Sequence, residues 1–325
     1  MRSWLIRTLA AVLVLLGLAV GLRVMSLWQM GRIGFYPGTI HTRQARPEGG
    51  FHWPYRLYIP QDGARWLWVR TNNSSAGVSD HFQQHDDDAL ALLEVSRRPA
   101  EALGAAVLVP SFPRPASDPL IYTHALDRDT VLEPPPLGGL HTQLWAMVDD
   151  AVAHLSTLGV TPCSRVLLDG YSASGMFASR LMLIAPERIA GAAVGAPGGW
   201  PMVPIAEHSG VALRYPLGVA DYEELFSRPL PREQLQALPA YFYLGSEDTN
   251  DALPYADAYD DEDRLASEGL GDTPVARWPV AEQMFDGYPV RFELLPGKDH
   301  GQAQFNEDAV VDFFQERVVQ ERCAG

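Results

Sequence analysis

The sequence predicts an α/β fold, with a mostly parallel central sheet that helices cover on both faces. Short, continuous apolar runs recur along the chain, as expected of strands buried on both faces. They include Ala105–Val109, Arg165–Asp169 and Ala240–Leu244. Between the first two, apolar residues at positions 144, 147, 148, 151, 152, 155 and 158 follow the 3.6-residue period of a helix. Strands that alternate with helices in this way indicate a parallel sheet.

The first element in chain order lies at the N-terminus. Thr8–Leu22 is uncharged and apolar and follows Arg2 and Arg7, which is typical of a signal peptide or a membrane anchor. As a helix it would reach about 22 Å, short of the roughly 30 Å hydrocarbon core, which favours a signal peptide. Apolar residues continue after Arg23, and the best cleavage site is Ala19–Gly21, so an uncleaved anchor stays open. Either alternative predicts export to the periplasm or the exterior, with membrane attachment through residues 8–22 if the segment is retained.

The remaining chain, residues 36–325, is expected to form one domain after the signal or anchor of residues 1–30. Residues 36–100 look irregular, with edge strands at Arg56–Ile59 and Arg65–Val69. The later elements are predicted as helix Ser174–Ile184, strands Ile189–Gly195 and Val290–Leu295, and helix Glu307–Val319.

Composition excludes one broad class of function. The 325 residues include 25 Lys+Arg against 40 Asp+Glu, a formal net charge of −15, whereas a nucleic-acid binder needs a basic surface. Apolar residues make up 47% of the chain, so a packed core is expected.

A candidate nucleophile lies between strand Arg165–Asp169 and the next helix. The run Gly170-Tyr171-Ser172-Ala173-Ser174-Gly175 has small residues two before and two after Ser172, as a sharp strand-to-helix turn requires. Ser174 is the rival nucleophile, but its own second neighbour is the larger Met176.

A serine nucleophile needs a histidine base and a carboxylate that orients the histidine. Asp248 follows strand Ala240–Leu244, and His300 follows strand Val290–Leu295, in the chain order expected for this architecture. Asp251 and Glu247 are weaker candidates for the acid.

The developing oxyanion needs backbone N–H donors. One is expected from Ala173, directly after the nucleophile. The other is expected from the loop after strand Ala105–Val109, at Ser111 or Phe112.

With these motifs, GYSASG, GSEDTND and PGKDHG, roughly residues 105–320 resemble the α/β-hydrolase superfamily. Within it, the chain is similar to secreted serine esterases of the poly(3-hydroxybutyrate) depolymerase and feruloyl esterase type. The resemblance implies Ser172 as nucleophile, Asp248 as acid and His300 as base, acting on a small-molecule or polymeric ester without a cofactor.

Two features depart from that pattern. Pro110–Arg114 replaces the His-Gly pair that often marks the oxyanion loop, and 51 residues separate Asp248 from His300. The second departure predicts an insertion around residues 255–285 that walls the pocket. The alternatives to an esterase are a serine peptidase of prolyl-oligopeptidase type, for which the segment before the core is too short to hold a propeller, and a non-catalytic binding protein.

The remaining candidates concern the pocket and metal binding. Trp200, Tyr122 and His124 are candidates to contact substrate. The acidic segment 257–263 and the pair His81 and His85 lack the ligand spacing of known metal sites, so surface roles and no metal are expected.

Two cysteines, Cys163 and Cys323, are present, and both are expected at the end of the sheet opposite the nucleophile. In an oxidising compartment a disulfide between them is plausible.

Overall fold

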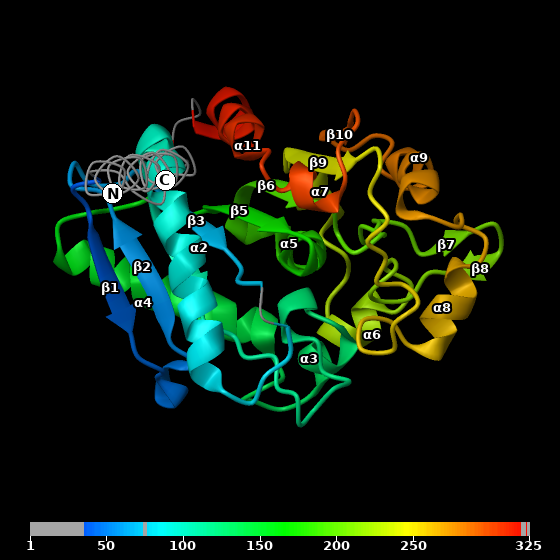
Figure 1. The fold of residues 1–325 in the computed structure, drawn as a ribbon, viewed down its shortest axis with the longest axis horizontal. Helices are drawn as coiled ribbons and strands as arrows, with labels where there is room; N and C mark the ends of the chain where they lie inside the picture. Colours follow the sequence, from blue (N-terminus) through cyan, green and yellow to red (C-terminus); the bar gives the residue numbers. More distant parts are fainter. Residues whose placement is uncertain (1–35, 74–76, 320–322, 324–325) are drawn as a thin grey trace, which may run out of the picture.

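The core of the protein is an eight-stranded, mostly parallel sheet, seen in a computed structural model that describes residues 36–73, 77–319 and 323. The strand order is β1-β2-β4-β3-β5-β6-β9-β10, which runs from left to right in Figure 1. Strand β2 is antiparallel to β1 and β4, and the other neighbouring pairs are parallel. The strands are β1 (Thr39–Arg43), β2 (Tyr55–Ile59), β3 (Trp66–Arg70), β4 (Ala105–Pro110), β5 (Val166–Tyr171), β6 (Ile189–Gly195), β9 (Ala240–Gly245) and β10 (Val290–Leu295), with a separate hairpin of β7 (Glu207–His208) and β8 (Val211–Ala212).

Helices cover both faces of this sheet, as predicted. One buried cluster joins the sheet to α2 (Phe82–Leu103) and α11 (Glu307–Phe314), which continues as a π-helical turn, Gln315–Val319. The cluster on the other face joins it to α4 (Leu140–Thr157) and α5 (Ala173–Ile184). The shorter helices are α3 (Arg128–Leu132), α6 (Tyr222–Phe226), α7 (Arg232–Gln236), α8 (Asp261–Ser267), α9 (Pro274–Met284) and α10 (His300–Ala303), with 3₁₀ turns at Pro47–Gly49, Thr123–Ala125 and Pro186–Arg188.

The segment 36–100 is more regular than predicted, because it contains the 22-residue helix α2. The buried face of α2 includes polar side chains, among them His85, Asp86 and Ser96, and Pro99 lies inside the helix. These residues interrupt the 3.6-residue apolar pattern within α2, although the helix packs on the sheet. Strand β3, expected at an edge, instead lies between β4 and β5, the strand that leads to the candidate nucleophile Ser172.

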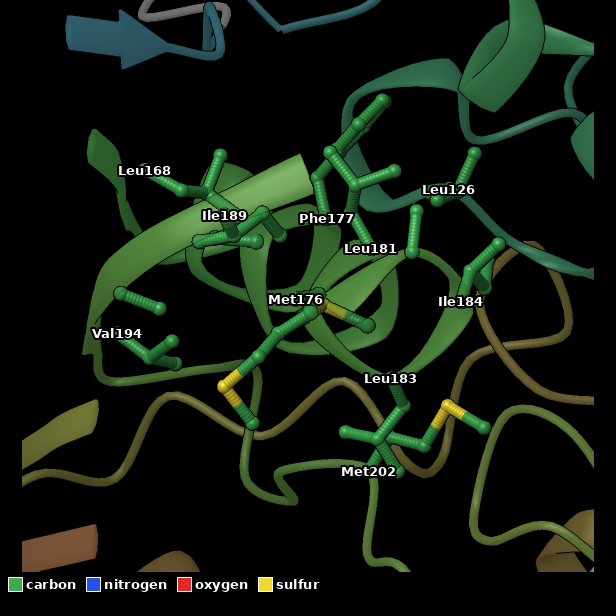
Figure 2. Packing of buried hydrophobic residues seen from close by; sticks show 14 of the residues in the cluster. Leu126, Leu168, Met176, Phe177, Leu181, Leu183, Ile184, Ile189, Val194 and Met202 are labelled. Carbon is green, nitrogen blue, oxygen red and sulfur yellow. The ribbon is translucent and has the colours of Figure 1, made fainter. Parts of the chain in front are cut away.

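Helix α5 is buried on all sides, since each of its residues from Ala173 to Ile184 is buried. In Figure 2, Phe177 and Leu181 pack with the rest of this cluster, and Met176 lies near Val194 of β6. A helix packed on all sides has little freedom to shift. The turn at its N-terminus is therefore held firmly.

The two cysteines lie together at the far end of the sheet from the nucleophile turn. Cys163 precedes β5 and forms a disulfide with Cys323, with a Cα–Cα distance of 5.3 Å. The bond attaches the C-terminal segment to the start of the nucleophile strand.

The predicted signal or anchor segment, Thr8–Leu22, lies outside the described residues. Among the residues that the structure does describe, no helix combines the length and apolar character needed to cross a bilayer.

Candidate active site

The turn from β5 into α5 places Ser172 in a conformation that few residues other than glycine adopt. Ser172 has φ 61° and ψ −122°. A Cβ atom on Gly170 would lie 2.0 Å from the carbonyl oxygen of Ser174, and one on Gly175 would lie 2.3 Å from the carbonyl oxygen of Gly195. The turn therefore has no room for a side chain at positions 170 and 175. It holds the Ser172 side chain at the carboxyl end of the strand.

The rival nucleophile, Ser174, is turned back into this structure. It is buried, its Oγ donates a hydrogen bond to the Tyr171 carbonyl (2.8 Å), and it accepts one from the Tyr171 N–H (2.9 Å). Both bonds stabilise the turn, so Ser174 fills the second small position without presenting its hydroxyl to a substrate.

Three residues that are far apart in sequence meet beside this turn. His300 Nε2 lies 3.0 Å from Ser172 Oγ, and His300 Nδ1 lies 2.8 Å from Asp248 Oδ2. The Asp248 side chain is fully buried, and the His300 side chain is 26% exposed. An imidazole between a hydroxyl and a buried carboxylate can take the hydroxyl proton while the carboxylate stabilises the resulting cation.

Local bonds hold both partners in place. Asp248 follows β9, and its Oδ1 accepts a hydrogen bond from the Asn250 N–H (2.8 Å). His300 begins α10, which Asp299 caps by accepting a hydrogen bond from the Gln302 N–H (2.8 Å). The Tyr171 hydroxyl donates to the His300 carbonyl (2.6 Å). Through that bond the nucleophile turn also supports the histidine loop.

The other two candidate acids occupy different positions. Asp251 forms an ion pair with Arg277 of α9 and accepts a hydrogen bond from the Leu253 N–H. Glu247 is exposed to solvent. Of the three carboxylates considered, Asp248 is the one in contact with His300.

The two amides predicted as the second oxyanion donor form hydrogen bonds with other groups. The Ser111 N–H donates to the Pro54 carbonyl (3.0 Å), and the Phe112 N–H donates to Asn72 Oδ1 (3.3 Å). Both amides are therefore engaged away from Ser172. The reason is topological, because β4 is separated from the nucleophile strand by β3.

The loop beside the nucleophile turn instead follows β3 and opens with Thr71–Asn73. The Thr71 hydroxyl donates to the Ser174 carbonyl (3.3 Å), and Asn73 Nδ2 donates to the Tyr171 carbonyl (3.3 Å). This loop was not predicted from the sequence, because the strand before it was expected at an edge of the sheet. In this fold the second donor generally comes from the loop after the third strand.

A cavity of about 220 Å³ opens beside Ser172 and Ala173. Its lining includes Tyr122, one of the predicted substrate residues, and Arg114, Met176, Gly198, Asn250, Asp251 and Ala252, which were not predicted to line it, together with Tyr255 and Asp257. Tyr255 and Asp257 belong to the segment 255–285, which contributes to the wall.

Two of the predicted substrate residues lie outside this cavity. Trp200 is 1% exposed, and its indole N–H donates to the Leu217 carbonyl (3.0 Å). His124 is buried against the Phe112 carbonyl (2.7 Å), and burial lowers its pKa to about 3. Both side chains therefore support neighbouring loops.

Several carboxylates of the acidic segment after residue 256 form ion pairs or helix caps within the protein. Asp257 pairs with Arg114, Asp260 and Asp263 form a capping box, and Glu262 contacts Arg214. Within the described part of the chain, no group of three or more His, Cys, Asp or Glu residues is arranged to hold a metal ion.

The sequence matches no protein-family model and no curated protein. Among solved structures, the chain is similar to the poly(3-hydroxybutyrate) depolymerase from Bordetella parapertussis, at 18% identity and a TM-score of 0.54, covering 89% of this chain and 93% of that one. It is also similar to poly(aspartic acid) hydrolase-1 from Sphingomonas sp. KT-1, at 18% identity and a TM-score of 0.52, covering 84% and 98%. The chain has the α/β-hydrolase fold, as its motifs predicted.

Proposed function

We propose that this protein is a serine hydrolase that cleaves carboxylic esters through an acyl-enzyme. The observation that carries the proposal is the continuous chain of contacts from Ser172 Oγ through the His300 ring to Asp248, at 3.0 and 2.8 Å. These distances are those of hydrogen bonds through which a proton can move.

Each residue has a distinct part in the proposed reaction. Ser172 Oγ attacks the ester carbonyl carbon while His300 Nε2 accepts its proton, and a tetrahedral intermediate forms. As the C–O bond to the alcohol breaks, the imidazolium gives that proton to the departing oxygen. Water then attacks the acyl-enzyme with His300 again as base, which releases the acid and restores Ser172. Asp248 holds Nδ1–H throughout and stabilises the imidazolium.

The negative charge on the intermediate needs donors on the side away from His300. The Ala173 N–H lies at the first turn of α5, where the helix dipole also favours an anion. For the second donor we propose a backbone N–H of the loop after β3, at Asn72 or Asn73, which replaces the predicted Ser111 and Phe112.

Export is part of the proposal. The apolar segment Thr8–Leu22 predicts translocation, and the Cys163–Cys323 disulfide fits an oxidising compartment. Fractionation of cells that express the full chain should place the protein outside the cytoplasm. N-terminal sequencing of the mature protein would distinguish a cleaved signal from a retained anchor, and a cytoplasmic product would contradict the proposal.

A pair of serine variants tests the chemistry directly. Ser172→Ala should abolish labelling by a fluorophosphonate probe and lower the turnover of p-nitrophenyl acetate by at least about 10⁴-fold. Ser174→Ala is the matched control, because it removes a neighbouring hydroxyl that bonds to the Tyr171 backbone and not to His300. It should keep most of the labelling. Full turnover in a folded Ser172→Ala protein would refute the proposal.

A further inference from the structure

The cavity beside Ser172 is small and lies on one side of the reacting groups. Its volume of about 220 Å³ is below the 300 to 1,000 Å³ typical of sites for drug-sized ligands. Ser172, Ala173 and Met176 line it, whereas His300 does not. In the proposed reaction the leaving alcohol takes its proton from His300 and therefore lies next to the imidazole. The group that enters this cavity is then the acyl group.

A charged pair is part of the wall of this cavity. Arg114 Nη2 lies 2.6 Å from Asp257 Oδ2, and the two side chains are 17% and 20% exposed. Arg114 belongs to the loop after β4, and Asp257 belongs to the segment between β9 and α8. The ion pair thus links two loops that are 143 residues apart in sequence.

Contacts on several sides hold Arg114 in position. Its backbone nitrogen lies 3.3 Å from His85 Nε2, and its carbonyl accepts a hydrogen bond from the Ser79 N–H (2.9 Å). Its guanidinium carbon lies 3.4 Å from the centre of the Tyr122 ring, as in a stacked cation–π contact. A side chain fixed by its backbone, an aromatic face and an ion pair forms a firm wall.

We propose that the Arg114–Asp257 pair is the specificity-determining wall of the acyl pocket, which restricts the enzyme to esters of short acyl groups. The inference rests on the proposed esterase function. A long alkyl chain would have to enter the space of the two side chains and remove water from a charged pair. Burying charges beside hydrocarbon is unfavourable unless they keep their hydrogen bonds. A short acyl group needs less of the cavity of about 220 Å³ and does not require that space.

The test compares p-nitrophenyl acetate, butyrate, hexanoate and octanoate in the wild type, Arg114→Ala, Asp257→Ala and the double variant. The wild type should prefer the short esters. Either single variant should raise the octanoate-to-acetate ratio of kcat/KM by about tenfold, the lower end of what one methylene group contributes in a pocket. The double variant should add little to the larger single effect, because the two side chains act as one wall.

Two controls separate this inference from its alternatives. Asp149→Ala removes a carboxylate from an exposed ion pair with Arg188, away from the cavity, and should leave the ratio unchanged. A second ester series keeps the acetyl group and enlarges the alcohol, and the Arg114 and Asp257 variants should not alter that profile.

An unchanged octanoate-to-acetate ratio in folded Arg114→Ala and Asp257→Ala proteins would overturn the inference. So would a response confined to the alcohol series, because the cavity would then hold the leaving group. Both results leave the proposed function intact as long as Ser172→Ala is inactive. Turnover that survives in Ser172→Ala would instead remove the proposed function.

Discussion

Two neighbouring carboxylates, Asp248 and Asp251, are proposed to have different roles, and mutations can distinguish them. Asp248 is the proposed catalytic acid, whereas Asp251 forms an ion pair with Arg277. The Arg277 side chain is 3% exposed and the Asp251 side chain is 18% exposed. Burial lowers the pKa of Arg277, and Asp251 is the nearest charge that opposes this shift. In the Asp251→Ala protein, a buried cation would lose its partner.

The expected loss of stability follows from this burial. Removing one partner of a fully buried pair typically costs about 3–5 kcal/mol. Because Asp251 is partly exposed, we expect the lower end, about 3 kcal/mol of the free energy of unfolding. At roughly 2 °C per kcal/mol for a domain of this size, the Tm should fall by about 6 °C.

Asp248→Asn should instead lower the activity strongly and leave the stability almost unchanged. The amide group fits the same space, but its NH₂ can only donate toward Nδ1 of His300, which moves the ring proton to Nε2. His300 could then no longer accept the Ser172 proton, and kcat should fall by about 10⁴-fold. The stability should stay near that of the wild type, because the substitution keeps the shape of the side chain.

Thermal unfolding and ester turnover, measured on both variants, test this contrast. Asp149→Ala serves as the control for a lost carboxylate, since Asp149 is 65% exposed and should change the stability by at most about 1 kcal/mol. The reasoning is refuted if a folded Asp251→Ala protein is as inactive as Asp248→Asn. An equal loss of stability in Asp149→Ala and Asp251→Ala would refute the stability estimate.

Three further predictions concern the turn, the pH response and the disulfide. Tyr171→Phe removes the hydroxyl that bonds to the His300 carbonyl, so kcat should fall by about 10-fold while KM changes little, measured with p-nitrophenyl acetate; an unchanged kcat would contradict this positioning role. Burial lowers the pKa of His141 to about 4, so the unfolded chain takes up a proton first and stability falls as the pH drops from about 6.5 to 4. His141→Phe should make that fall shallower in denaturant titrations, and an identical slope would count against it. Cys163→Ser should lower the stability by about 2–4 kcal/mol. Peptide mapping without reductant should recover Cys163 linked to Cys323, and two free thiols would exclude the bond.

Local rules were sufficient to predict much of the site. Gly170 and Ser174 around Ser172 predicted a sharp turn, because only small residues fit there, and the structure has that turn. Asp248 and His300 were expected at the ends of parallel strands, and neighbouring strands in such a sheet end at the same edge. Strand order and chain direction therefore place His300 between Ser172 and Asp248, in contact with both.

The loop beside Ser172 could not be predicted from the sequence, because its position depends on which strands are neighbours in the sheet. The place of β3 between β4 and β5 moves the loop beside the nucleophile from Ser111 to Thr71–Asn73. Trp200 follows β6 at the correct edge of the sheet, but its indole N–H donates to the Leu217 carbonyl, 17 residues further along the chain, and its side chain is buried.

The sequence by itself determined the α/β class, the order of the candidate catalytic residues and the turn that holds Ser172, because each depends on residues close together in the chain. Only the tertiary structure decided that Asp251 pairs with Arg277 and that Arg114 meets Asp257 beside the pocket. The first contact joins the loop after β9 to helix α9, and the second joins two loops that are 143 residues apart in sequence. Their partners are set by how the sheet and its insertions pack, which no local pattern of residues records.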